Sequence, residues 1–549
     1  MPRDDNLRSM DARRAAKTLV GTALLALGAC AGMSPWLSAR MPPPESLAAI
    51  SAVELHRHVT TLSSTPYEGR APGTRGEDLT VDYLVSEFRH AGARPGNPDG
   101  SFVQEVPLIG IASHPDAAFC AGARCTTWKL NEDYVGGSLF LQPEIEVQNS
   151  EVVFVGYGLV APEDGRDDYK DVDVRGKTVL MLAADPGPMD VPGEVRPEST
   201  RSGGSYATRA LALARKREEA VAKGAAARIL VHEKNDPIGP LATYAWSPEE
   251  LDVESRSMQH LPVSLRAEEA KVRELVALAG QDFDALKRRA RAKDFRPVSL
   301  GVVANLSVRN GLRRFPSRNV LALIPGGDPK LKNEYVVYVA HWDHLGSNPS
   351  RAGDPVYHGA LDNASGVAAL VEIARAYSRL PAPPRRSVLF LATTGEENGL
   401  LGAKHYIQHP LYPLQRTIGV LNLDALNPWG PTRDFEIVGT ASGAMHLALI
   451  DAAAAMGKEL SADTRPDMGF FYRSDQLEFS RVGLASIWIR RGTSYIDRPS
   501  SYGREKNAAY FANDYHQPSD TARPDWDYAG MAEQVKFTYV VGYRLAMGE

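Results

Sequence analysis

Short apolar runs that alternate with helical stretches are the feature of this sequence that most limits its fold. From residue 317 onward, four near-continuous apolar runs of strand length occupy 319–324, 335–340, 388–393 and 418–423. Helical patterns are expected between and after them, at 363–379, 399–408 and 443–457. Strands that are apolar on both faces must be covered on both faces. The sequence therefore predicts an α/β fold, with a sheet between two layers of helices.

Polar residues that suit metal binding follow these apolar runs. His341 and Asp343 come after the run 335–340, Glu396 and Glu397 after 388–393, and Asp424 after 418–423. In an open α/β sheet, ligands bind beyond the carboxyl ends of the strands. We therefore expect these side chains to converge on one rim of the sheet. Asp362, just before the helix 363–379, and His516, near the C-terminus, are further candidates.

The chemistry of the candidate ligands points to hydrolysis assisted by a metal. Three carboxylates and two imidazoles without a thiolate suit Zn²⁺ in an open site, and also Mn²⁺ or Co²⁺. Crowded buried carboxylates resist ionisation unless a cation compensates them. Two divalent ions would supply that charge and can share a carboxylate and a water.

Six short motifs carry a resemblance to a known family. They are A-H-W-D-H-L-G at 340–346, G-A-L-D-N-A-S-G at 359–366, T-G-E-E-N-G at 394–399, N-L-D at 422–424, R-S-D at 473–475 and Y-H-Q-P-S-D at 515–520. In order and spacing the chain resembles the di-zinc aminopeptidases related to bacterial leucyl aminopeptidase and yeast aminopeptidase Y. That family also includes glutamate carboxypeptidase and glutaminyl cyclase. The resemblance implies a three-layer, zinc-exopeptidase-type mixed sheet.

The resemblance implies two zinc sites that share one ligand. Asp362 would bridge both metals. Glu397 and His516 would complete one site, and His341 and Asp424 would complete the other.

The resemblance also implies roles for residues that do not bind metal. Glu396 would be the general base on a metal-bridged water. Asp343 would accept the N–H of the His341 imidazole and orient it. Tyr515 would stabilise the tetrahedral oxyanion, and Arg473 would contact the substrate backbone.

Simpler interpretations of the weaker candidates stay open. Asp343 could cap a turn, Tyr515 could be a packing aromatic, and Arg473 could form a surface ion pair. We expect His344 to be structural or to support a ligand. Gln476 departs from many relatives, which have His after the Ser-Asp of that motif. The polar segment 490–513 is expected to be a loop over the active site.

The implied function is removal of the N-terminal residue from peptides with a free N-terminus. A carboxypeptidase-like or glutaminyl-cyclase-like enzyme on the same fold is the alternative, followed by a non-catalytic surface receptor. The receptor reading is disfavoured because Glu396 and all five ligands are present. The net charge of −5 gives no electrostatic case for nucleic-acid binding.

The N-terminus predicts export. Five basic residues within 1–17 precede a twelve-residue apolar run, 18–29, which is too short to span a bilayer stably. The segment 27–30 resembles a bacterial lipobox, in which Cys30 is lipidated and anchors the chain to a membrane. A plain secretory signal is the alternative. Because Ala31 follows Cys30, we expect an outer-membrane lipoprotein that faces the periplasm.

The remaining two cysteines, Cys120 and Cys125, have four residues between them in a chain expected to be exported. An oxidising compartment favours a local disulfide between them, although two free thiols remain the alternative.

The chain is expected to contain two folded units after its leader. We predict a signal peptide over 1–29, a tether over 30–45 and a catalytic domain split into 46–125 and 311–549. Helices are expected at 45–65 and 76–92. Residues 126–310 resemble the smaller, β-rich protease-associated domain that is commonly inserted in the family.

Overall fold

The computed structural model describes residues 41–161, 165–183, 215–232, 249–252, 260–465 and 469–548. The predicted signal peptide 1–29, Cys30 and most of the tether lie outside the described residues. Among the helices that are described, none is long and apolar enough to cross a membrane.

A mixed β-sheet forms the centre of the 311–549 region, as predicted. Four parallel strands lie in the order β14-β13-β15-β18. Their bounds are Ser387–Thr393 for β14, Tyr335–His341 for β13, Thr417–Asn422 for β15 and Ser486–Arg491 for β18. Antiparallel neighbours flank them: β12 (Val298–Ile324) beside β14, and β16 (Asp434–Thr440) beside β18, with β17 (Glu459–Ala462) at the edge.

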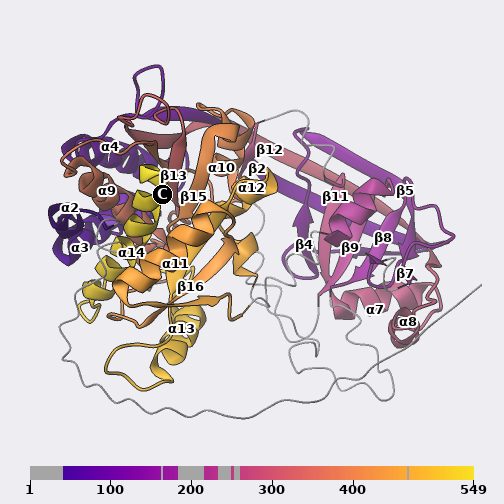
Figure 1. Cartoon of the computed structure of the whole chain (residues 1–549). Coiled ribbons are helices and arrows are strands. Elements are labelled where there is room, and N and C mark those ends of the chain that lie inside the picture. Colours follow the sequence, from indigo (N-terminus) through magenta and orange to yellow (C-terminus); the bar gives the residue numbers. More distant parts are fainter. Residues whose placement is uncertain are drawn as a thin grey trace, which may run out of the picture. The chain divides into compact units, whose positions relative to one another are not determined.

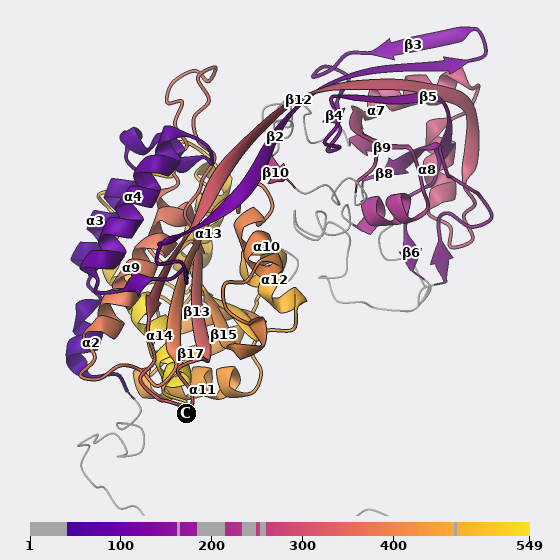
Figure 2. The same cartoon turned by 90° about the horizontal axis from the view of Figure 1, so that it is seen from above.

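Helices cover both faces of this sheet (Figures 1 and 2). Val336 and Tyr338 of β13 belong to a core shared with α3 (Ala52–Leu62), α4 (Arg75–His90), α9 (Ser365–Ser378) and α14 (Tyr528–Met547). Val337 and Val339 belong to a second core, with α10 (Leu401–Gln408) and α12 (Gln476–Arg481). Successive strand residues face opposite sides of a sheet. The doubly apolar strands therefore have the two helical layers that their sequence predicted.

Helices α3 and α9 begin where a polar side chain accepts a backbone N–H of the first turn. The helix expected at 45–65 is divided into α2 (Pro44–Ala49) and α3, because Ser51 interrupts it and its Oγ accepts the Glu54 N–H at 3.1 Å. Asn363 Oδ1 accepts the Gly366 N–H at 2.9 Å at the start of α9. This cap places the chain just before α9, where Asp362 stands, in a fixed position.

Residues of the predicted insertion surround hydrophobic cores of their own. Strands β5 (Glu144–Phe154), β8 (Thr178–Leu182), β9 (Ala227–His232) and β11 (Val263–Glu268) are parallel neighbours, with β4 (Tyr134–Gly137) antiparallel to β11. Helices α7 (Glu269–Leu278) and α8 (Phe283–Ala290) contribute apolar residues to the larger of these cores. Strand β12 pairs with β5 at one end and with β14 at the other, so it crosses the predicted boundary at 310.

Strand β12 also pairs with β2 (Val103–Ala121) over a long antiparallel ladder, which Figure 2 shows. The next strand, β3 (Arg124–Trp128), forms a hairpin with β2. The structure joins Cys120 and Cys125 by a disulfide across this hairpin.

The expectation of a loop over 490–513 is wrong for its second half. Residues Tyr502–Asn513 form helix α13. Its buried residues, Gly503, Asn507 and Tyr510, recur every three or four positions, as on one face of a helix. Two of the three are not apolar, so an apolar periodicity could not reveal this helix.

Candidate active site

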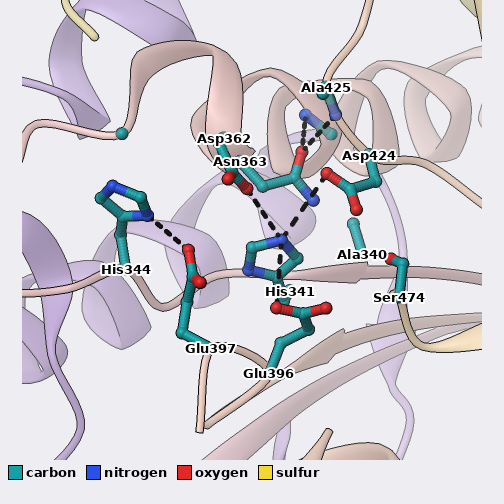
Figure 3. Close-up of polar contacts among 12 residues, drawn as sticks. Ala340, His341, His344, Asp362, Asn363, Glu396, Glu397, Asp424, Ala425 and Ser474 are labelled. Atoms are coloured by element: carbon teal, nitrogen blue, oxygen red, sulfur yellow. Dashed lines mark hydrogen bonds and ion pairs between the residues drawn. The ribbon is translucent and has the colours of Figure 1, made fainter. Parts of the chain in front are cut away.

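The predicted ligands converge at the carboxyl ends of the parallel strands (Figure 3). His341 is the last residue of β13, Glu396 and Glu397 follow β14, and Asp424 follows β15. Because these strands are parallel neighbours, their ends deliver the side chains to one place. All of these residues are largely buried.

His341 is surrounded by three carboxylates. Its Nε2 lies 3.3 Å from Asp362 Oδ1, 3.7 Å from Asp424 Oδ1 and 3.9 Å from Glu396 Oε2. Among the described residues, this buried nitrogen has no hydrogen-bond partner of acceptable geometry. The imidazole nitrogen and the three carboxylate oxygens therefore face a common centre, as metal ligands do, and they are not arranged as hydrogen-bonded pairs.

A second group forms on the other side of Asp362. His516 Nε2 lies 3.2 Å from Asp362 Oδ2 and 3.0 Å from Glu397 Oε2. Asp362 thus presents one oxygen to each imidazole. His344 donates from Nδ1 to Glu397 Oε1 at 2.6 Å, so it orients one of the predicted ligands.

Asp343 makes a contact different from the expected one. The Nδ1–H of His341 donates to the backbone carbonyl of Asp343 at 3.2 Å, whereas the carboxylate lies 3.9 Å away. That carboxylate instead accepts the backbone N–H groups of Glu396 at 3.1 Å and Glu397 at 3.3 Å. Asp343 therefore fixes the loop that carries Glu396 and Glu397, and orients His341 only through its main chain.

The electrostatics of the site call for positive charge. Burial works to lower the pKa of His341, but the carboxylates of Glu396, Asp362 and Asp424 raise that pKa well above its ordinary value. Burial likewise opposes the charged form of His516, yet Glu397 and Asp362 raise its pKa to about 10. Without another cation, the carboxylates hold protons on both imidazoles.

Burial has the largest effect on the pKa of two carboxyl groups near the ligands, those of Asp343 and Glu396. It raises the pKa of Asp343 to about 7. It also raises the pKa of Glu396 well above its usual range, although His341 acts in the opposite direction. Glu397 behaves differently, because His516 and His344 together overcome the effect of burial and bring its pKa to about 2.

These residues fit divalent metal ions. Groups of ligand atoms within 4.8 Å of one another include His341 with Asp362 and Asp424, and Asp362 with Glu397 and His344. Mixed imidazole and carboxylate donors suit Zn²⁺ and similar ions. Such ions would replace the protons that the carboxylates otherwise hold on the imidazoles.

Comparison with known proteins identifies the region that carries these ligands. Residues 319–540 match the profile of peptidase family M28. This segment is a peptidase family M28 domain. His341, Asp362, Glu397, Asp424 and His516 all lie within the matched residues.

Relatives of the M28 domain include named peptidases. Aminopeptidase NAALADL1 of Mus musculus is 35% identical over 130 residues, which are 23% of this chain and 16% of that protein. Leupeptin-inactivating enzyme 1 of Streptomyces exfoliatus is 27% identical over 207 residues, 37% of this chain and 43% of that protein. The chain therefore matches less than half of the length of either relative.

A solved structure is similar over most of the chain. An aminopeptidase from Aneurinibacillus sp. strain AM-1 superposes with a TM-score of 0.52 over 91% of this chain and 94% of its own, at 19% sequence identity. At this identity the likeness concerns the fold, and it extends well beyond the M28 domain.

Two residues that sequence reasoning missed hold the M28 domain's ligands in place. Asp520 is buried, and its carboxylate accepts the backbone N–H groups of Leu361 and Asp362 at 3.1 Å. Arg70 ends the 3-10 helix Thr65–Arg70, which follows α3, and its guanidinium donates to the carbonyls of Trp342 at 2.9 Å and Gly359 at 2.8 Å. Arg70 belongs to none of the six sequence motifs, so nothing in the sequence signalled this role.

Arg70 is almost fully buried, and it has two more carbonyl partners, Leu62 at 2.7 Å and His358 at 2.8 Å. We expect Arg70→Met to lower the free energy of unfolding by at least about 3 kcal/mol, since each unsatisfied buried carbonyl costs roughly 1–3 kcal/mol. Urea unfolding would measure the loss. Arg75→Met removes an exposed guanidinium from the start of α4 and is the matched control. Equal midpoints for the two variants would contradict the role given to Arg70.

A cavity opens onto the candidate ligands of the M28 domain. Its lining includes four carboxylates, three arginines and five aromatic rings: Asp362, Glu396, Glu397, Asp424, Arg473, Arg490, Arg491, Phe470, Trp488, Tyr510, Phe511 and Tyr515. Arg473 donates to the Tyr515 hydroxyl at 2.9 Å. The two weaker candidates from the sequence thus lie together on the wall of this cavity.

Gln476, the departure from the family pattern, is buried beside the M28 site. Its Oε1 accepts from Asn422 at 2.7 Å, and its Nε2 donates to the Phe471 carbonyl at 2.9 Å. It therefore ties the end of β15 to the segment that carries Arg473.

Proposed function

We propose that this chain is a zinc-dependent aminopeptidase with two zinc ions, which removes the N-terminal residue from peptides. The observation that carries the proposal is the placement of Asp362 between two imidazoles, His341 and His516, with a different oxygen directed at each. Asp424 and Glu397 complete the two ligand groups. The names of the relatives support a peptidase that acts on N-termini.

The ligands would divide between two ions. His341 and Asp424 would hold one, Glu397 and His516 the other, and Asp362 would contribute to both. When bound, such ions polarise the scissile carbonyl and make water a better nucleophile. Mn²⁺ or Co²⁺ would suit the same donors.

Glu396 is the proposed general base. Its carboxylate lies at the cavity beside the ligands without belonging to either pair. It would take a proton from the attacking water and pass it to the leaving amine. Asp343 fixes its backbone N–H, so the carboxylate is held where that transfer is needed.

Tyr515 is the proposed donor to the oxyanion. Its hydroxyl oxygen accepts from Arg473, so the phenolic proton is free to point toward the substrate. A donor fixed before the reaction stabilises the charge that develops on the carbonyl oxygen. Arg473 thus acts on the substrate through Tyr515 as well as from its own place on the cavity wall.

The proposal is tested with matched substrates that differ only at the α-amine. We expect leucine p-nitroanilide to be cleaved and its N-acetyl derivative to be left intact, because the carboxylates at the site offer acceptors to a free amine. Chelation should abolish the cleavage, and added zinc should restore it. Release of C-terminal residues from N-acetylated peptides would instead favour the carboxypeptidase-like alternative.

We also keep three features as proposals. A protease-associated domain over 126–310 is supported by its separate hydrophobic cores and by the M28 match, which starts after it. Export is supported by the apolar run 18–29, and lipid anchoring to the outer membrane by Cys30 and Ala31. The disulfide between Cys120 and Cys125 agrees with an oxidising compartment.

A further inference from the structure

One arginine of the cavity forms no ion pair with any residue that the structure describes. Arg491 ends β18, is 3% exposed and lines the cavity. Its Nε donates to Asn507 Oδ1 at 2.9 Å, and its Nη1 donates to the Ala425 carbonyl at 2.5 Å. Both acceptors are neutral. The remaining terminal nitrogen, Nη2, is buried and has no partner among the described residues.

The two other arginines of the cavity are satisfied differently. Arg490 forms an ion pair with Glu436 at 2.5 Å, so its charge is balanced within the fold. Arg473 donates to Tyr515. The four carboxylates of the cavity lie at the proposed metal site, and none of them forms an ion pair with Arg491, although the charge of Asp424 acts on it from a distance. A buried guanidinium without a counter-ion is costly, and a binding partner that brings negative charge would offset that cost.

The surroundings of Arg491 favour a bound anion. Its guanidinium carbon lies 4.8 Å from the centre of the Trp429 ring and 5.8 Å from that of Tyr510. These rings limit its contact with water, and a charged hydrogen bond is stronger where water is excluded. The guanidinium donates to the carbonyl of Ala425, the residue that directly follows Asp424 in the chain. An anion bound there would therefore lie near the reacting end of a substrate.

We propose that Arg491 binds a carboxylate of the substrate and selects peptides that bring an anionic group into this cavity. The proposal rests on the aminopeptidase function proposed above and names its substrate class. Two sources of the carboxylate fit the same chemistry. One is the side chain of an acidic N-terminal residue, and the other is the C-terminal carboxylate of a dipeptide.

Five substrates separate these two sources. The p-nitroanilides of glutamate, glutamine and leucine test a side-chain carboxylate, and dialanine against dialanine amide tests a terminal one. We expect one charged member to exceed its neutral partner in kcat/KM by roughly 10- to 100-fold, the usual effect of a hydrogen bond to a charged group. Equal rates within both pairs would overturn the proposal.

Substitution of Arg491 tests whether it is the source of the preference. In Arg491→Met the ratio of charged to neutral substrate should fall close to one, and Arg491→Lys should retain part of it. Arg481→Met removes a guanidinium that pairs with Glu478 on α12 and should leave the ratio unchanged. A merely structural role for Arg491 would lower kcat/KM for all five substrates by one factor, and that result would reject selection by Arg491.

A binding measurement keeps the two proposals distinguishable. If none of the free-amine substrates is cleaved, the aminopeptidase function fails by itself. Thermal unfolding with free glutamate or glutamine then tests Arg491, because a ligand that binds the folded state raises Tm. Glutamate should stabilise the unaltered protein more than glutamine does, and Arg491→Met should lose that difference. Equal shifts for glutamate and glutamine would exclude the side-chain source, and equal shifts for dialanine and dialanine amide as well would overturn the inference.

Discussion

Glu396→Gln should retain its zinc and lose catalysis. Glutamine has nearly the shape of glutamate but cannot accept a proton, and the carboxylate is not one of the proposed ligand pairs. We expect kcat to fall by about 10²- to 10⁴-fold, the usual contribution of general acid–base catalysis, while KM changes little. Kinetics with leucine p-nitroanilide and metal analysis of the same preparation would measure both effects.

Glu274→Gln is the matched control, because Glu274 is an exposed residue of α7 that pairs with Lys271. Activity close to that of the unaltered protein in Glu396→Gln would remove Glu396 as the base. Loss of zinc in that variant would instead make Glu396 a ligand and require a different proton acceptor.

Asp362→Asn should lose metal before it loses its fold. The substitution removes the carboxylate that faces both His341 and His516, while the backbone of residue 362 stays held by Asp520. We expect zinc affinity to fall by more than the roughly 10- to 100-fold that loss of an outer partner of a ligand costs. Because Asp362 serves both proposed ions, zinc content should fall toward zero, and activity should fall with it.

Two measurements distinguish a lost ligand from a damaged fold. The urea midpoint of metal-free Asp362→Asn should stay close to that of the metal-free unaltered protein. Asp173→Asn, at an exposed ion pair with Arg175, should change neither zinc content nor activity. Retention of two zinc ions by Asp362→Asn would contradict the bridging role.

The sheet and most of the site could be predicted because their residues obey local rules. Strands that are apolar on both faces predict a sheet covered by helices on both sides. The acids and histidines directly after these strands indicate where the candidate site lies. Arg491 obeys the same rule at the end of β18, yet its strand was not assigned, so it was missed. His516 follows no apolar strand, and only its motif pointed to it.

The features that sequence could not predict depend on contacts between distant segments. Arg70 and Asp520 act through backbone groups of other loops, and no local pattern encodes such a partner. Two of the three buried residues of helix α13, Gly503 and Asn507, are not apolar, so the helix has no apolar periodicity in the sequence. The contact of His341 with the main chain of Asp343 rather than its carboxylate is a matter of tenths of an ångström, which spacing alone cannot resolve.

Strand β12, which is 27 residues long, contributes residues to a hydrophobic core of the 311–549 region and to one of the 126–310 region. A module joined by a flexible linker can be lost or exchanged without a change in its host. Here the sheet and the proposed insertion over 126–310 form hydrogen bonds along one uninterrupted backbone, with β14 at one end and β5 at the other. A cut at residue 310 would leave the pairs of β12 with β14 at 320–324 in place, but it would sever the strand that joins the two regions.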